Sequence, residues 1–412
     1  MSSTLIVGID VSSQSNSVFF MDSEGICLLK KAFFVPNDTT GADIIIADAI
    51  SCAQNINASC IKFGMESTSH YSWHLQQYLY NSSELMPFHT EVYLMNPACV
   101  KGMKKLYPHT QKTDTIDAVM IAQTVRFGNV RPSPKPDFRF VALQRLTRYR
   151  FSLVHTLINE KNRASNLIYL KFSSYKSDCP FSNVFGKAST ALIEKYTPDQ
   201  IAKLSSEELV EFIVSQGNNR LKDPKEIVNG LKKAANRAYR LHPNLDDSVG
   251  LSLTMTLENI RFLEKQLDKL DKEIENHLKA FSHTLTTIPG IGPVIAAGLV
   301  AEIGDISRFK NEAALAKYAG LVWNKYQSGN FCGEETSLAK CGNQYLRYYL
   351  VEAANSIRMH SSEFSAYYAK KYGEVTKHQH KRALVLTARK FLRLVFAMLS
   401  KGQIYRERGN VV

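Results

Sequence analysis

Two apolar segments of this sequence each end in a carboxylate, and this pattern constrains the fold more than any other feature. Residues 4–11, TLIVGIDV, are apolar and β-branched enough for a buried strand, with Asp10 at its end. Residues 61–65 have the same character and lead directly to Glu66. A charge at the end of a buried strand must be paired or bound to metal, because burying an isolated charge is costly. The pattern therefore predicts a sheet with a polar site along one edge.

The segments around these acids alternate as they do in an α/β domain. Further strands are predicted at residues 17–20, 26–34 and 91–95, and helices at 41–56, 69–80, 97–107 and 115–127. A turn at residues 22–25 joins the second and third strands as a hairpin. A meander of three strands followed by alternating helices and strands is the element order of an RNase H-like α/β domain, which we predict for residues 1–138.

Two further acids lie three residues apart at the start of a predicted helix. The segment KTDTIDA places Asp114 and Asp117 on one helix face, because residues i and i+3 are neighbours there. Taken alone, Asp114 is better explained as a helix cap, and Asp10 could simply end a strand in a turn. Together, the three elements could bring four carboxylates to one sheet edge. Such a set suits Mg²⁺, and two ions can stabilise the attacking and leaving oxygens of a phosphodiester displacement.

The composition points to a polyanionic partner. The 412 residues suggest two domains and a connector, and 51 Lys and Arg against 38 Asp and Glu give a net charge of +13. Nucleic acid is the first expected partner and an anionic membrane surface the second. The sequence has no apolar run of membrane-spanning length and no pattern of a signal peptide. Seven scattered cysteines without a CxxC pair indicate reduced thiols in a cytoplasm, rather than a disulfide framework or a zinc finger.

Beyond a proline-rich break at residues 131–137, the chain is predicted to be helical up to residue 283. A long basic helix over residues 139–172 is expected to contact phosphates through Arg145, Arg148, Lys161 and Arg163. Residues 173–250 are polar and weakly patterned, which suggests a variable helical connector. Residues 253–278 carry a heptad-like series of Leu and Ile, which predicts a coiled coil; a solvated helix packed on its own chain is the alternative.

A glycine-rich turn opens the α-rich domain that we predict over residues 284–412. The segment TIPGIGP places Gly290 and Gly292 before a helix of small apolar residues. Glycine lets the backbone approach a phosphate, and the free N–H groups of a helix N-terminus can bind it. The pattern is typical of a helix-hairpin-helix that grips DNA backbone, with its second helix at residues 312–318. A plain glycine turn between packed helices is the alternative.

Ser328 lies in a polar loop further along the same domain. Lys325, Lys340 and Arg347 surround it in sequence with positive charge. A serine hydroxyl on such a loop could attack a phosphodiester, although most loop serines are only solvated.

Taken together, these motifs resemble those of the DEDD transposases of the insertion-sequence 110 family, which includes the Piv-type DNA invertases. The resemblance rests on VGIDVS, GMEST and KTDTIDA, and then on TIPGIGP and QSG…LAKCGNQYLRYYLVEAA. Residues 173–250 match no motif of the family. The loop after Ser328 reads NFCGEETSL, with Glu334 and Glu335 where the family usually has more basic residues.

The resemblance implies an RuvC-like domain joined by a coiled coil to a transposase domain. It implies that Mg²⁺ or Mn²⁺ is held by Asp10, Glu66, Asp114 and Asp117, and that Ser328 is a nucleophile. It also implies a homo-oligomer, a dimer or tetramer, in which the serine of one protomer can meet the metal site of another. Double-stranded donor and target DNA would be the substrates and a structured RNA the guide, in a bacterial or archaeal cytoplasm.

The residues alone leave three functions open. A transposase or recombinase would need both the carboxylates and Ser328, and would pass through a phosphoserine-linked intermediate. A junction nuclease of RuvC type would use water and would not need Ser328. A non-enzymatic nucleic-acid-binding scaffold would need neither and would show no metal dependence. The acidic cluster weighs against the scaffold, because it repels DNA unless metal neutralises it.

Overall fold

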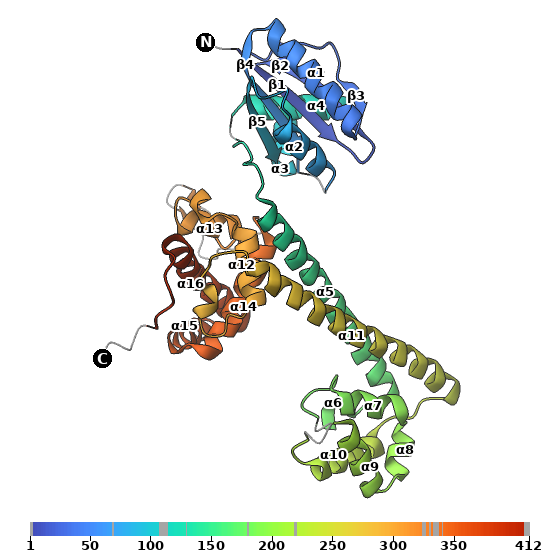
Figure 1. The fold of residues 1–412 in the computed structure, drawn as a ribbon. Coiled ribbons are helices and arrows are strands. Elements are labelled where there is room, and N and C mark those ends of the chain that lie inside the picture. The colour runs from blue at the N-terminus through green and yellow to red at the C-terminus, as the bar shows by residue number, and fades with distance from the viewer. Residues whose placement is uncertain are drawn as a thin grey trace. The chain divides into compact units, whose positions relative to one another are not determined.

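The structure is a computed structural model that describes most of the chain. The described residues are 3–67, 70–106, 114–128, 130–178, 181–217, 221–323, 327–328, 331–332, 338–339 and 341–407. Their contacts divide the chain into two compact units, Met1–Pro136 and Asp137–Val412, and Figure 1 shows the elements of each. Within the described residues, no helix combines the length and the apolar character needed to cross a membrane.

The first unit is built on a five-stranded mixed sheet. Its strands are β1 (Ser3–Val11), β2 (Ser15–Asp22), β3 (Phe33–Pro36), β4 (Ala58–Glu66) and β5 (His89–Met95). The order across the sheet is β3-β2-β1-β4-β5, in which β1, β2 and β3 form an antiparallel meander. Strands β4 and β5 run parallel to β1. This is the element order from which the sequence predicted an RNase H-like domain.

The third strand begins later than the sequence predicted. The predicted strand covered residues 26–34, whereas β3 begins only at Phe33. Residues 28–31 form bends, and Cys27 makes only an isolated bridge with Met21. The side chain of Ile26, whose apolar character favoured a strand, is 62% exposed. The prediction was therefore wrong here: after the bridge to Met21 and a hydrogen bond from the N–H of Leu28 to the carbonyl of Phe20, the chain bends away from β2, and the ladder resumes only at Phe33.

Helices cover both faces of this sheet. They are α1 (Thr39–Asn55), α2 (Tyr71–Asn81), α3 (Pro97–Lys104) and α4 (Asp114–Arg126). Because side chains of a strand alternate between faces, Leu5, Val7 and Ile9 point into a core shared with α1 and α2. Ile6 points to the other face, into a smaller core shared with α3 and α4. Helix α4 therefore covers one face of the sheet and α1 the opposite face (Figure 1).

The second unit is organised on a pair of long helices. Helices α5 (Phe138–Lys171) and α11 (Pro243–Leu278) lie side by side along their length (Figure 1). Leu143, near the start of α5, shares a buried cluster with Ile274, near the end of α11. Ile168, near the end of α5, shares a second cluster with Leu253, near the start of α11. The pair is therefore antiparallel, with a hydrophobic core at each end.

The heptad series lies on α11, and the apolar face of this helix is buried against other helices of the same chain. The buried members are Leu253, Ile260, Leu267, Leu270 and Ile274, and Leu263 is partly buried. The helix packs along α5 of the same chain. The structure thus matches the alternative of a helix packed on its own chain. Pairing between protomers is not needed to bury these side chains.

The polar segment at residues 173–250 folds into short helices, and their core is shared with the end of α5 and the start of α11. These are α6 (Tyr175–Asp178), α7 (Lys187–Lys195), α8 (Pro198–Lys203), α9 (Ser206–Gln216) and α10 (Pro224–Arg237). Capping boxes begin α8, with Thr197 and Gln200, and α9, with Ser205 and Glu208. In each box a hydroxyl and a longer polar side chain satisfy free N–H groups at the helix start, which explains why a polar segment is helical.

The rest of the chain forms a helical group around α12 (Pro293–Ile303), whose residues from 296 onward are buried. The other elements are the 3₁₀ turns η1 (Leu285–Thr287) and η2 (Ile306–Arg308), the helices α13 (Glu312–Ala319), α14 (Gln344–His360), α15 (Ser362–Gly373) and α16 (Gln379–Lys401), and the short strands β6 (Gln327–Ser328) and β7 (Phe331–Cys332). Their core includes residues of α5 and α11.

Candidate active site

Three of the four predicted carboxylates converge on the sheet face that α4 covers. Strands β1 and β4 are parallel with Ile9 opposite Met65, so Asp10 and Glu66 follow on adjacent strands. Ile9 and Met65 point into the core on the α1 side, and alternation directs Asp10 and Glu66 to the other face. Asp117 lies in the first turn of α4, and its side chain is 17% exposed.

Two glycines let α4 lie close to the sheet. Gly8 and Gly64 each stand two residues before a carboxylate and therefore on the same face as that carboxylate. A Cβ atom on Gly8 would lie 2.1 Å from the carbonyl oxygen of Ala118, and one on Gly64 would lie 2.6 Å from Cγ2 of Val125. A larger residue would push α4 away from the sheet. This role of the two glycines was not predicted, although the glycine-x-acid spacing is repeated in both motifs.

The carboxylates are close enough to interact electrostatically. Burial raises the pKa of the Glu66 carboxyl, and the negative charges of Asp10 and Asp117 raise it further, whereas Lys104 lowers it. The Nζ atom of Lys104, at the end of α3, lies 2.5 Å from Oδ1 of Asp117. Three acids with one lysine leave an excess of negative charge. This is a set of hard oxygen donors that fits a divalent cation.

Two predicted residues are described only by their backbone. Asp114 is the first residue of α4, and its side chain lies outside the described residues. Ser328 lies in β6 opposite Phe331 of β7, and its side chain also lies outside the described residues. Lys325 and Lys340, which were predicted to supply positive charge beside the serine, fall outside them altogether.

A buried ionic network lies at the start of α14. The carboxylate of Glu302 on α12 is fully buried, and Arg148 of α5 donates to its two oxygens at 2.7 and 2.9 Å. Nδ2 of Asn343 donates to the same carboxylate at 2.7 Å. Oδ1 of Asn343 accepts hydrogen bonds from two backbone N–H groups and so caps α14. Asn343 therefore ties α14 to α12, and Arg148 ties α5 to the same carboxylate.

The structure corrects the role predicted for Arg148. The sequence predicted a contact with nucleic acid, but the guanidinium is committed to Glu302 and also lies over the ring of Tyr345, 4.5 Å from its centroid. An arginine that neutralises a buried acid is not available for a phosphate. Arg148 therefore has a structural role between α5 and α12.

The other predicted basic residues differ in their partners. Lys161 pairs with Glu264 at 2.7 Å, and Arg347 donates to two backbone carbonyls at 3.1 and 3.3 Å. Both contacts hold elements of the second unit together. Arg145 and Arg163 are exposed on α5. Arg163 pairs with Glu160 of the same helix at 3.1 Å.

The predicted glycine turn lies directly before α12. Gly292 is the N-cap residue, it is exposed, and a Cβ atom there would meet nothing within 4 Å. Gly290 has a φ of +82°, and its carbonyl accepts a hydrogen bond from Oγ of Ser356 at 2.6 Å. The turn is thus anchored on α14 at Gly290 and open at Gly292. The helix-hairpin-helix assignment stays a prediction.

Replacing Arg148 by methionine is expected to destabilise the protein by about 3–5 kcal/mol, because it leaves the buried charge of Glu302 without its main partner. A double variant that also carries Glu302→Gln should recover much of this loss. Chemical denaturation of the full chain measures both. The matched control is Arg163→Met, which removes an exposed pair with Glu160 and should cost no more than about 1 kcal/mol. Equal losses for the two single variants would contradict the structural role of Arg148.

Comparison with known proteins places this chain among transposases. The model of the IS110 DEDD family, described as a transposase, matches residues 7–172, which include the four predicted carboxylates. A model described as the transposase IS116/IS110/IS902 family matches residues 282–369, which include Ser328.

Several curated proteins are similar over much of the chain. A protein of insertion element IS110 from Streptomyces coelicolor is 28% identical, with 75% of this chain and 76% of that protein covered. A protein of insertion element IS116 from Streptomyces clavuligerus is 25% identical, with 74% and 75% covered. A pilin gene-inverting protein from Moraxella bovis is 28% identical over 37% of this chain and 49% of its own length.

A likeness to one solved structure is much weaker. RuvC of T. thermophilus in complex with a Holliday junction substrate is 14% identical, and its whole length covers 32% of this chain with a TM-score of 0.24. A score at that level does not establish a common fold. The sheet order therefore remains the basis for the RNase H-like prediction.

The family matches define the chain as a DNA transposase or recombinase, an enzyme that rearranges DNA. It belongs to the insertion-sequence 110 family of transposases, which confirms the family predicted from the motifs. Membership of a DEDD family implies dependence on divalent metal in general.

Proposed function

We propose that this transposase cleaves and exchanges DNA strands in a metal-dependent reaction that passes through a serine-linked intermediate. The observation that carries the proposal is the meeting of Asp10, Glu66 and Asp117 on the face between the sheet and α4. We propose that residues 1–138 form an RuvC-like domain, 139–283 a connector and 284–412 the transposase domain with the serine. Three carboxylates that repel one another are best explained by a cation that binds between them.

The carboxylates are proposed to hold the metal. Mg²⁺ or Mn²⁺ on Asp10, Glu66, Asp114 and Asp117 would supply positive charge beside the scissile phosphate and thereby favour displacement at phosphorus. Lys104 already occupies one oxygen of Asp117 and keeps part of the negative charge neutralised without metal. The three described carboxylates are fixed by strand register and by the packing of α4, so they need little rearrangement to hold an ion.

Ser328 is the proposed nucleophile. Its Oγ atom would form a bond to phosphorus while the bond from phosphorus to one deoxyribose oxygen breaks. The hydroxyl loses its proton, and the departing oxygen gains one. The number of phosphodiester bonds is unchanged, so the reverse reaction with another strand end rejoins DNA without ATP. Positive charge near the serine would stabilise the pentacoordinate phosphorus, and Lys325, Lys340 and Arg347 are the proposed source.

The proposed partners are double-stranded donor and target DNA and a structured guide RNA. Arg145 and Arg163 on α5, together with the open N-terminus of α12 at Gly292, are the described groups that suit phosphate contacts. The net charge of +13 supports such a surface. A homo-oligomer, a dimer or tetramer, remains part of the proposal, but not through the heptads of α11, which are filled within the chain.

A strand-exchange assay tests this function. The full chain is incubated with DNA that carries the ends of its element, with target DNA and with RNA transcribed from the flanks of its gene. We expect joined donor–target products in Mg²⁺ and none in EDTA, and a loss of product when the RNA is replaced by a shuffled sequence. Cut DNA that is never rejoined would favour the water-using nuclease, and binding without any cleavage would favour the scaffold.

A further inference from the structure

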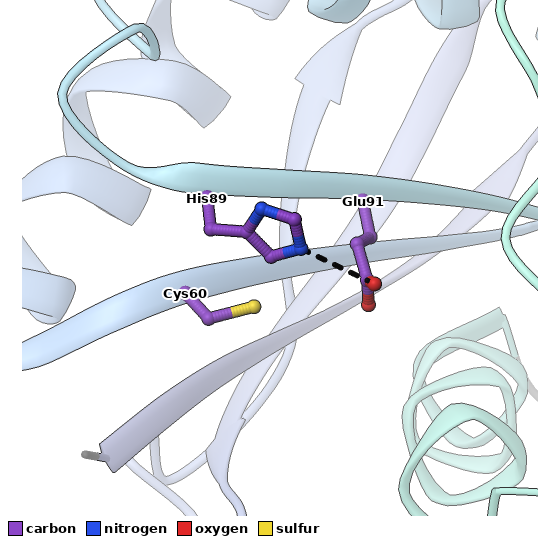
Figure 2. A group of neighbouring side chains, drawn as sticks. All are labelled: Cys60, His89 and Glu91. Carbon is purple, nitrogen blue, oxygen red and sulfur yellow. Dashed lines mark ion pairs between the residues drawn. The ribbon is translucent and has the colours of Figure 1, made fainter.

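A second group of metal-binding side chains lies on the sheet of the first unit, away from the carboxylates. Cys60 of β4 is opposite His89 of β5, and Glu91 stands two residues further along β5. Because side chains alternate along a strand, all three lie on one face. Their ligand atoms lie within 4.8 Å of one another, and Figure 2 shows the thiol, the imidazole and the carboxylate together.

The carboxylate of Glu91 is held in one orientation. The hydroxyl of Tyr93 donates a hydrogen bond to Oε2 at 2.7 Å, and Nζ of Lys62 lies 3.5 Å from the same oxygen. The other oxygen, Oε1, lies 3.4 Å from Nε2 of His89, as the dashed line in Figure 2 marks. One oxygen is therefore fixed by protein donors, and the other is directed toward the imidazole. Outer hydrogen bonds of this kind position metal ligands in proteins.

We propose that Cys60, His89 and Glu91 bind a zinc ion. A thiolate, an imidazole and a carboxylate are the ligand types that Zn²⁺ takes, and water would complete a tetrahedral set. A sulfur and a nitrogen ligand favour Zn²⁺ over Mg²⁺, which prefers oxygen. The sequence has no CxxC pair and so does not predict a zinc finger, but ligands that meet across two strands leave no local motif in the sequence.

Binding replaces the proton of the thiol. Burial and the charge of Glu91 raise the pKa of Cys60, whereas Lys62 lowers it. The thiol is therefore protonated at neutral pH without metal, and formation of the zinc–sulfur bond releases one proton to solvent. The side chain of His89 is 73% exposed, so it can turn toward the ion at little cost. The affinity should fall as the pH is lowered, because protons compete with zinc for the sulfur.

This position is separate from the proposed catalytic metal. Cys60 and Glu66 lie six residues apart on β4, which corresponds to about 20 Å along a strand. Strand β5 is an edge of the sheet, and the ion would link it to β4. An ion that binds only the folded chain stabilises that chain by mass action. The proposed role is therefore to secure an edge strand, and it does not depend on the catalytic proposal.

Zinc titration of the full chain tests the proposal. The protein carries Asp10→Asn and Asp117→Asn, so that binding at the carboxylates does not contribute. We expect one Zn²⁺ per chain, a rise in melting temperature, and a thiolate-to-metal charge-transfer band when Co²⁺ replaces Zn²⁺. Cys60→Ser and His89→Ala should each weaken binding at least about tenfold, because each removes one of three protein ligands. Cys27→Ser, which changes an exposed cysteine elsewhere in the same unit, is the matched control.

Two results would overturn the proposal. One is a Co²⁺ complex without the thiolate band, and the other is an equal rise in melting temperature for Zn²⁺ with the Cys60→Ser protein. If Cys60→Ser fails to fold, His89→Ala decides, because His89 is exposed and its loss should not affect folding. Unchanged zinc affinity in His89→Ala would then reject the site.

Discussion

Replacing Asp10 or Asp117 by asparagine is expected to abolish strand cleavage while DNA binding persists. The metal is expected to contribute several kcal/mol of charge stabilisation, and each tenfold in rate corresponds to about 1.4 kcal/mol. A loss of about a thousandfold or more should therefore follow. Single-turnover cleavage of element-end DNA measures the rate, and a gel-shift assay measures binding. Asp48→Asn, which changes an exposed acid on α1, is the control and should cleave at the normal rate.

The Asp10→Asn variant should not be less stable than the unaltered chain in metal-free buffer. The pKa of Glu66 is raised by burial and by Asp10 and Asp117, so the folded chain binds this proton more tightly than the unfolded chain does. The Glu66 carboxyl therefore adds to the free energy of unfolding at low pH, and this contribution is lost as the pH rises through its pKa in the folded chain. At neutral pH the charged cluster therefore costs stability, and Asp10→Asn relieves part of that cost. An inactive variant that also melts at a lower temperature in EDTA would contradict this account of the site.

Ser328→Ala is expected to remove every covalent protein–DNA adduct and to stop strand exchange. An alanine has no oxygen to attack phosphorus, and positive charge nearby cannot replace it. Suicide DNA substrates, in which the departing strand diffuses away, trap the adduct of the unaltered protein in denaturing gels. DNA affinity should change little, because the substitution removes one small side chain. Ser282→Ala, which changes an exposed serine elsewhere in the second unit, is the control and should form the adduct normally.

This experiment separates the recombinase from the junction nuclease. A nuclease that uses water would cut DNA at the normal rate with Ser328→Ala and would never form an adduct. That pair of results would remove the serine from the mechanism. It would leave the carboxylate site in place, since the two proposals depend on different residues.

The meeting of the carboxylates could be predicted because each of them follows a recognisable local sequence pattern. An acid at the end of an apolar strand is visible in the sequence, and parallel pairing of β1 and β4 then brings Asp10 beside Glu66. Lys104 could not be predicted in the same way, because only the packing of α3 against α4 brings it to Asp117. The closeness of α4 to the sheet could have been inferred from Gly8 and Gly64, which lack side chains on the covered face.

The role of Arg148 was mistaken for a physical reason. A basic helix displays its charges in the sequence, but the partner of each charge is set by tertiary packing. Glu302 lies 154 residues away on α12. One signal was available: Glu302 is the only acid within the run of apolar residues at 294–303, and a buried acid needs a donor. The start of the third strand was also predicted wrongly, because Ile26 is apolar but belongs to the turn after β2, where its side chain is exposed.

The core around α12 limits where this chain can be divided so that its C-terminal part is exchanged between mobile elements. Leu143 of α5 and Ile274 of α11 belong to that core, although both precede the glycine turn by sequence. The region matched by the second family model, residues 282–369, is thus an incomplete folding module. A hybrid protein that takes its C-terminal part from another element would have to inherit α5 and α11 with it. Inheritance of the serine loop is therefore tied to inheritance of the long helix pair.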